Sequence, residues 1–168
     1  MGRALTISKS IAFLFVLVGF TYAFAEQAGK SEKYLTTADI TQVTGFKDVR
    51  LSESKQSSST GHLYLSNNEG RQILKVKLYR ASLYKKDEAA KLGLIKGEVT
   101  GIGEAAYYGP NADTPYILSF KKGEFYVELS TIVDKNNVKN GKLQFFLTME
   151  QLKALGSIIA SRIENPKH

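Results

Sequence analysis

Cysteine and tryptophan are both missing from this chain of 168 residues, which also has only two histidines. Without cysteine the protein can form no disulfide and has no thiolate metal ligand or thiol nucleophile. It also has no cysteine at the end of a leader to carry a lipid anchor. His62 and His168 have no acidic neighbours at the spacing of a zinc site. We therefore expect neither a metal ion nor another cofactor.

The first 25 residues have the pattern of a secretory signal peptide. Arg3 and Lys9 form a basic start, residues 11–20 are almost entirely apolar, and Ala23-Phe24-Ala25 matches an A-x-A cleavage site. The apolar run is shorter than the roughly 20 residues that span a membrane. We expect cleavage after Ala25 and no transmembrane span afterwards, with a retained membrane helix as the alternative. The mature protein is then periplasmic or secreted.

Removal of Arg3 and Lys9 with this leader lowers the formal net charge from +7 to +5. Acidic partners outside the cytoplasm are envelope polymers or anionic lipids, and we expect no nucleic-acid partner there. The simpler interpretation of the lysines is that they keep the surface soluble. The length suits a flexible leader over 26–33 and one domain over 34–164, which we expect to be a monomer.

One helix is predicted near each end of the domain. Thr36 and Asp39 have the spacing of a capping box, and Gly45 is a typical left-handed helix end. Thr148 and Gln151 repeat the capping signal for the second helix. The second helix has an apolar stripe at helical spacing, formed by Leu152, Leu155, Ile159 and Ile163.

The region between these helices favours strands. Residues 72–80 alternate between apolar and polar side chains, so we expect Lys75 and Lys77 to face water. Residues 116–120 and 125–129 alternate in the same way around a Lys-Lys-Gly-Glu turn, which predicts a hairpin. We interpret 87–94 as a short helix or turn.

Residues 134–141 are read as a polar loop after the hairpin. Neighbouring strands without long helical crossovers predict an antiparallel sheet, with the terminal helices packed on it. The expected fold class is therefore α+β.

Residues 101–106, Gly-Ile-Gly-Glu-Ala-Ala, match the short pattern of a dinucleotide-binding loop. That loop needs a helix running on from it, and Gly109-Pro110 would stop such a helix after about one turn. We interpret the motif as a structural turn. Gly101 and Gly103 permit positive φ and close backbone approach, and Ala105 and Ala106 are small enough to lie under a packed helix.

The order of these features resembles a known family. A short helix ending in Thr44-Gly45, a strand meander, the 101–106 turn, a strand pair around Lys122-Gly123 and a closing amphipathic helix are similar to secreted bacterial PsbP-like domains. These include extracellular sensor domains of receptor serine/threonine kinases and exported proteins of unknown function. The resemblance covers 34–164. It implies an α/β/α sandwich around a twisted antiparallel sheet, and no shared catalytic residue.

A binding site is predicted where aromatic and cationic residues gather around the glycine turn and the hairpin. Together such groups could form an amphipathic binding face, although tyrosine is also ordinary on the outer face of a strand. The candidate ligand-binding residues are Tyr107, Tyr108, Tyr116, Tyr126, Lys121 and Lys122.

Three classes of function follow from these patterns. The first, which we favour, is an exported non-catalytic module of the bacterial cell envelope that binds a ligand or protein. The second is an envelope hydrolase using His62 as its base, with Ser57–Ser59 nearby in sequence. The third binds an anionic envelope polymer through its lysines.

Overall fold

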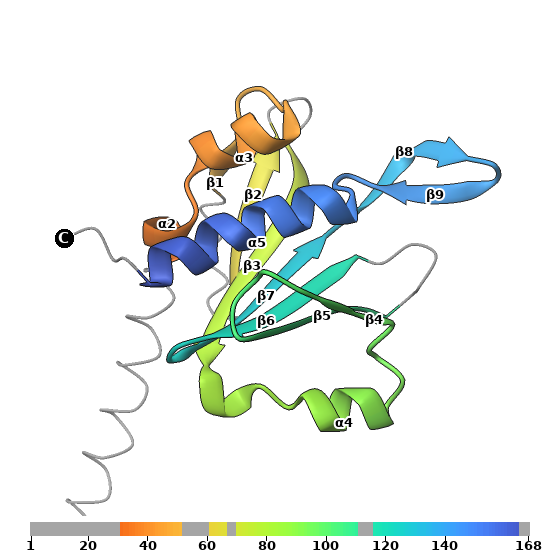
Figure 1. Ribbon diagram of the computed structural model, residues 1–168. Helices are drawn as coiled ribbons and strands as arrows, with labels where there is room; N and C mark the ends of the chain where they lie inside the picture. The colour runs from red at the N-terminus through yellow and green to blue at the C-terminus, as the bar shows by residue number, and fades with distance from the viewer. Residues whose placement is uncertain (1–30, 52–60, 67–69, 111–115, 165–168) are drawn as a thin grey trace, which may run out of the picture.

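A seven-stranded sheet forms the centre of the molecule, and each neighbouring pair of its strands is antiparallel (Figure 1). The computed structural model describes residues 31–51, 61–66, 70–110 and 116–164. The strands of the sheet are β1 (Arg50–Leu51), β2 (Gly61–Ser66), β3 (Arg71–Arg80), β4 (Gly97–Val99), β5 (Ala105–Gly109), β6 (Ile117–Lys122) and β7 (Phe125–Thr131).

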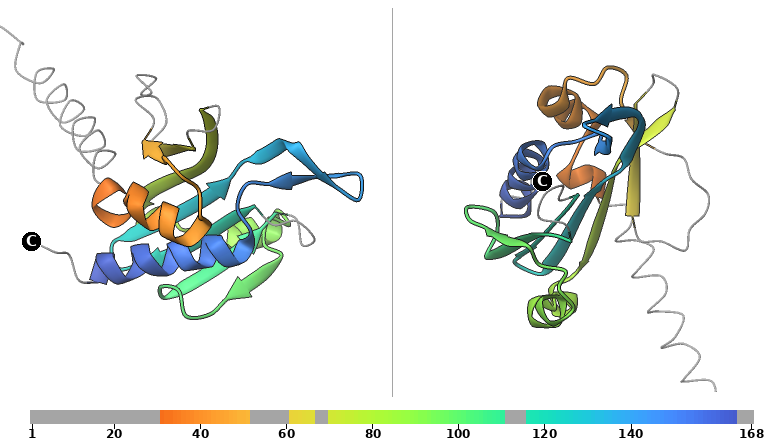
Figure 2. Two further views of the ribbon diagram at one scale, coloured as in Figure 1. Left: turned by 90° about the horizontal axis from the view of Figure 1, so that it is seen from above. Right: turned by 90° about the vertical axis from the view of Figure 1, so that its right-hand side faces the viewer.

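The strand order, β1-β2-β3-β7-β6-β5-β4, joins two meanders at the centre of the sheet. The first meander runs from the edge strand β1 through β2 to β3 at the centre of the sheet. The second runs from the opposite edge strand, β4, through β5 and β6 to β7. The chain must therefore cross from β3 to the distant β4 before the second meander begins. The crossing contains η1 (Ala81–Leu83) and α4 (Lys86–Lys91), and α4 lies beyond one end of the strands in Figures 1 and 2.

Three helices pack on one face of the sheet, called the core face here. They are α2 (Ser31–Tyr34), α3 (Thr37–Thr44) and α5 (Met149–Glu164). Figure 2 shows α3 and α5 side by side over this face. The expected α+β class, with a twisted antiparallel sheet and helices from both ends of the domain packed on it, is confirmed. Among the described helices, none has the length and apolar character needed to cross a membrane.

The core lies between α5 and the middle strands. Val76, Leu129 and Leu118 are cross-strand neighbours on β3, β7 and β6, and all three are fully buried. From the helix, Leu152, Leu155 and Ile159 are fully buried against this layer, so most of the predicted stripe does face the core. Gly156 lets the helix approach closely, because a Cβ there would stand 2.9 Å from Leu118 Cδ2.

The predicted helix ends are confirmed. Thr36 and Asp39 form a reciprocal capping box, and Gly45 ends α3 with φ of +75°. At the start of α5, Gln151 N–H donates to Thr148 Oγ1 and the Gln151 side chain accepts from Thr148 N–H. Each cap satisfies backbone donors that have no partner within the helix.

Two expectations about local structure need revision. Residues 134–141 are not a loop: β8 (Val133–Lys139) and β9 (Lys142–Phe145) form a separate two-stranded arm. Lys77 does not face open water, because its ammonium pairs with a carboxylate on β7. In addition, α2 takes up the last three residues of the expected leader, 31–33, and Tyr34 of this helix is buried.

The 101–106 segment forms a turn into β5. Gly101 and Gly103 both have positive φ, +79° and +62°. The two glycines differ in their surroundings, because a Cβ on Gly103 would overlap the carbonyl oxygen of Lys121, whereas nothing lies within 4 Å of one on Gly101. Glu104 N–H donates to that same carbonyl at 2.8 Å. Only Gly103 therefore combines positive φ with close backbone approach.

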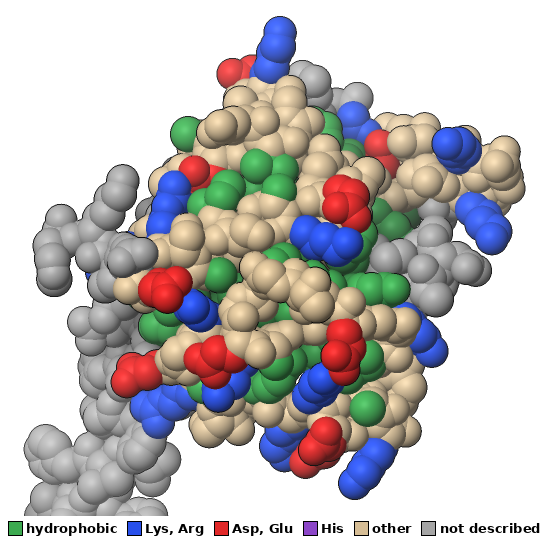
Figure 3. Space-filling view, viewed as in Figure 1, with side chains coloured by type: hydrophobic (Ala, Val, Ile, Leu, Met, Phe, Trp, Pro, Cys, Tyr) green, Lys and Arg blue, Asp and Glu red, His purple; other side chains and the backbone are tan. Residues whose placement is uncertain are grey.

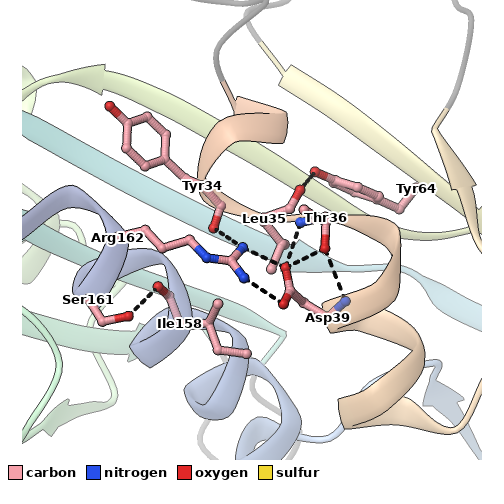
Figure 4. A network of polar contacts seen from close by, with 8 residues as sticks. All are labelled: Tyr34, Leu35, Thr36, Asp39, Tyr64, Ile158, Ser161 and Arg162. Atoms are coloured by element: carbon pink, nitrogen blue, oxygen red, sulfur yellow. Dashed lines mark hydrogen bonds and ion pairs between the residues drawn. The ribbon is translucent and has the colours of Figure 1, made fainter. Parts of the chain in front are cut away.

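A bidentate ion pair joins α3 to α5 (Figure 4). Arg162 Nη1 and Nη2 donate to the two carboxylate oxygens of Asp39 at 2.6 and 2.7 Å, and Nη1 also donates to the Tyr34 carbonyl at 3.2 Å. Burial opposes ionisation of Asp39, but the bonds from Arg162 and Thr36 outweigh it and lower the pKa of Asp39 from 3.8 to about 2.

The Asp39–Arg162 pair should make the stability of the fold depend on acidic pH. A carboxyl whose pKa is lowered on folding stabilises the folded state above its unfolded pKa, and this contribution disappears as the pH falls from about 4 to about 2. We expect Asp39→Asn to lower the free energy of unfolding at neutral pH by about 2 kcal/mol. Urea titrations over a pH series measure this.

Glu150→Gln serves as the control, because Glu150 also pairs with a lysine but its side chain is 82% exposed. Its effect should stay within about 0.5 kcal/mol, as for other surface substitutions. Between about pH 4 and about pH 2, the free energy of unfolding of the wild type should fall more steeply with decreasing pH than that of Asp39→Asn. Equal slopes for the two proteins would contradict the role given to the Asp39–Arg162 pair.

The two glycines of the turn offer a matched pair of substitutions. Gly101→Ala should lower the free energy of unfolding by about 1 kcal/mol, the penalty for an alanine at positive φ. Gly103→Ala should cost on the order of 3 kcal/mol, because the new methyl group also overlaps backbone that cannot rotate away. Thermal unfolding of both variants tests this, and equal losses would show that close approach at Gly103 is unimportant.

Candidate functional site

The face of the sheet opposite α5, called the far face here, carries polar and aromatic side chains at its centre. Because side chains alternate along a strand, β7 buries Val127 and Leu129 on the core face and turns Tyr126 and Glu128 to the far face. Cross-strand register places Tyr107 and Ser119 in line with Glu128. Strands β5, β6 and β7 thus present a continuous row of hydroxyl and carboxylate groups.

Four tyrosine rings pack together around this row. Tyr126 stacks on Tyr79 of β3 with ring centroids 5.3 Å apart. Tyr84, from the crossing between β3 and β4, meets Tyr126 edge-on at 5.4 Å and lies 5.8 Å from Tyr107. Such tilted and stacked arrangements are the favourable geometries for aromatic pairs. The crossing is thereby held against the far face of the sheet.

The carboxylate of Glu128 is neutralised by a neighbour. Lys77 Nζ lies 3.1 Å from Glu128 Oε1, and both side chains are about one fifth exposed. Burial alone would lower the pKa of Lys77, but the charge and hydrogen bond of Glu128 outweigh it and raise that pKa. Tyr126 also donates to Glu128 Oε2, at 3.4 Å. The centre of the far face therefore combines the Lys77–Glu128 ion pair with tyrosine hydroxyl groups.

Burial raises the pKa of two of these phenols, Tyr84 and Tyr126. Burial, with smaller contributions from Tyr107 and Glu98, raises the pKa of Tyr84 to about 12. Burial is also the main cause that raises the pKa of Tyr126. In the described part of the chain, the Tyr84 hydroxyl is the one buried side-chain polar atom without a hydrogen-bond partner. A buried hydroxyl of this kind costs free energy that a partner would recover.

A pocket of about 260 Å³ opens beside this cluster. It lies on the far face between the β3–β4 crossing and the ends of β5 and β6. Its wall combines apolar surface with phenol, hydroxyl and carboxylate groups. The lining residues are Leu94, Tyr107, Gly109, Pro110, Tyr116, Ile117, Ser119, Tyr126 and Glu128.

The structure brings together three of the six predicted binding residues and separates the others. Tyr107, Tyr116 and Tyr126 line the pocket. Tyr108 is the register partner of Leu118 on the core face, where its ring covers Gly97.

The two predicted lysines are engaged elsewhere. Lys121 shares the far face with Tyr126, but its ammonium lies 3.0 Å from Glu104. Lys122 pairs with Glu164 at the end of α5, at 3.3 Å. The predicted cationic component of the binding face is thus held in ion pairs outside the pocket.

Sequence reasoning missed Tyr84, Ser119 and Glu128. The alternation of 125–129 already placed Glu128 beside Tyr126 on one face of its strand, so its polar side chain was a usable signal. Ser119 follows from the same argument on β6. Tyr84 had no local signal, because its position depends on the path of the crossing.

The proposed catalytic base, His62, lies in β2 opposite Val76, but its side chain is outside the described residues. Ser57–Ser59 and His168 also lie outside the described residues. Among the described residues, no group of three or more acidic or histidine side chains is arranged to hold a metal ion.

The pocket can bind by stacking and by hydrogen bonding. Tyrosine rings offer flat apolar surface, while their hydroxyls, Ser119 and Glu128 offer donors and acceptors. Comparisons of this chain with family models, curated proteins and solved structures found no match. The PsbP-like resemblance and the expected export therefore stay predictions from the sequence.

The unpartnered hydroxyl of Tyr84 generates a stability prediction. Tyr84→Phe removes a buried polar atom without breaking a bond, so we expect stability to stay equal or rise by about 1 kcal/mol. Tyr64→Phe is the matched control: Tyr64 is fully buried, and its hydroxyl donates to the Leu35 carbonyl at 2.7 Å. This variant should lose about 1 kcal/mol.

Chemical unfolding at neutral pH measures both variants. A loss of stability in Tyr84→Phe as large as that in Tyr64→Phe would mean that the Tyr84 hydroxyl does have a partner in solution.

Proposed function

We propose that the protein is an exported, non-catalytic binding module of the bacterial cell envelope, and that the pocket on the far face binds a neutral, hydroxyl-rich ring such as a sugar unit. The signal-peptide pattern of residues 1–25 supports export. The convergence of Tyr107, Tyr116 and Tyr126 on one pocket, beside a charge-neutralised carboxylate, is the observation that carries the choice of ligand.

The electrostatics of the pocket favour an uncharged ligand. Among the described residues that line the pocket, Glu128 is the one that is ionised, and the Lys77 ammonium at 3.1 Å balances its charge. The phenol of Tyr126 is neutral at physiological pH, and burial raises its pKa further above that range. A charged ligand would lose its hydration without gaining an opposite charge that is free to pair with it. A neutral ligand avoids that cost.

The shape and chemistry of the wall favour a ring carrying hydroxyl groups. Tyr116 already stacks on Phe145 with ring centroids 5.0 Å apart, and its other ring face can stack on an apolar face of a ligand. The hydroxyls and the carboxylate of the pocket can bond the edges of that ligand. Lys77, Tyr126 and Ser130 donate to the Glu128 carboxylate. Because a carboxylate has about four lone-pair sites, it keeps acceptor capacity for a ligand. The pocket volume of about 260 Å³ suits a small unit at the end or side of a larger chain.

Short oligomers of N-acetylglucosamine, which are neutral and hydroxyl-rich, serve as the probe. We expect chemical-shift changes on titration to follow residues of β5, β6 and β7, with a dissociation constant on the order of millimolar. Tyr116→Ala should weaken binding about tenfold, equivalent to about 1.4 kcal/mol, because it removes one stacking surface.

Tyr108→Ala is the matched control, since it removes a tyrosine from the core face and leaves the pocket wall intact. Its affinity should change less than twofold, after its thermal unfolding has been checked. No binding to the oligomers, or equal losses in both variants, would contradict the proposed ligand class. Cleavage of the oligomers would favour the hydrolase hypothesis instead, for which His62→Ala is the test.

A further inference from the structure

The arm formed by β8 and β9 projects away from the body of the molecule (Figures 1 and 2). Residues 135–142 are all exposed. At its base, Asp134 is held by Arg71, whose Nη1 donates to Asp134 Oδ1 at 3.1 Å. The arm is thus anchored at one end, while its outer part contacts solvent.

The outer part of the arm carries charge of one sign. Lys135, Lys139 and Lys142 are exposed, and none of them forms an ion pair with a described residue. The arm's acidic residue, Asp134, is already paired with Arg71. Figure 3 shows the basic side chains at the tip of the arm, well separated from the acidic groups that accompany lysines on the body.

Two of these lysines are direct cross-strand neighbours. Lys139 pairs in register with Lys142 across a two-residue turn of Asn140 and Gly141. Both turn residues have positive φ, +52° and +73°, so this is the tight hairpin turn that an Asn-Gly pair favours. The turn holds the two lysines opposite each other, and like charges in that position destabilise a strand pair. An anion bound between them would relieve the repulsion.

We propose that this arm binds an extended polyanion with repeating phosphate groups. Lys135 lies in the irregular stretch between Asp134 and Val138, where the register of β8 with β9 shifts, and so apart from the Lys139–Lys142 pair that flanks the turn. A single phosphate group, with a charge of about −2, can bridge Lys139 and Lys142 but leaves the third lysine without a counter-charge. A linear chain lying along the arm can pair with all three. This site is separate from the pocket on the far face and does not depend on the ligand proposed there.

The composition of the arm favours a soluble polymer over a bilayer surface. Membrane-binding segments combine basic residues with aromatic or large apolar groups that enter the interface. The tip of the arm is Asn140-Gly141, and among the arm's described side chains Val138 is the exposed large apolar one, at 59%. Lysine attraction alone gives about 1 kcal/mol per residue at an anionic membrane, which is too weak for stable attachment.

Binding of linear polyphosphate to the purified protein, measured by fluorescence anisotropy of labelled polymer, tests the proposal. The variant Lys135→Gln/Lys139→Gln/Lys142→Gln should bind at least tenfold more weakly. For the wild type, the logarithm of the binding constant should fall with the logarithm of salt concentration with a slope of about −2, as for three cations on a single-stranded polyanion. The slope should approach zero in the variant.

A second triple variant, Lys47→Gln/Lys91→Gln/Lys96→Gln, controls for net charge. These three lysines are also exposed and without ion pairs to described residues, but they lie on the body. We expect the affinity of this variant for polyphosphate to fall less than threefold. Equal losses in the two variants would show non-specific attraction and overturn the proposal.

Vesicles of equal parts phosphatidylglycerol and phosphatidylcholine form the second arm of the experiment. We expect no stable sedimentation of the protein with them. Arm-dependent binding to vesicles without binding to polyphosphate would overturn the choice of a polymer. The melting temperature of the arm variant should equal or exceed that of the wild type, because the Lys139–Lys142 repulsion is removed.

Discussion

The antiparallel pairing of β3 with β7 supports the rest of this structure, because it joins two meanders that are otherwise separate. Its register sets both faces of the sheet at once. Val76 lies opposite Leu129 in the core, and the adjacent pair, Lys77 and Glu128, forms the ion pair on the far face. A slip of one residue would exchange these faces, burying charge under α5 and exposing the apolar residues to water. The core and the candidate pocket therefore depend on the same alignment.

The insertion of β7 beside β3 also creates the pocket. It forces the chain to leave β3 at the centre of the sheet and to begin β4 at the far edge, so the crossing must pass along the sheet. That passage places Tyr84 against Tyr107 and Tyr126, and it sets Leu94 at the pocket wall. Connections that cover a face without filling it completely commonly leave room for a ligand.

The two proposed binding surfaces differ in charge and in residue type. The pocket on the far face is close to neutral and aromatic, since Lys77 and Glu128 compensate each other. The β8–β9 arm is basic and carries no compensating acid beyond Asp134, which is engaged with Arg71. The proposed exported module would contact a glycan unit through the pocket and an anionic polymer of the envelope through the arm. The core face serves the stability of the fold, because the ion pair between Asp39 and Arg162 joins the helices that pack on it.

Local interactions explain what the sequence by itself determined. The capping residues Thr36 and Thr148 and the alternation of 72–80 act over a few neighbouring positions, so helix ends and strands were predictable. The Asn140-Gly141 turn was an equally local signal for β8 and β9, which the polarity of the segment obscured. The gathering of Tyr107, Tyr116 and Tyr126 was expected from their nearness in sequence. Tertiary structure alone decided the separation of Tyr108 and both lysines from them, because cross-strand register assigns each side chain to a face and to a partner.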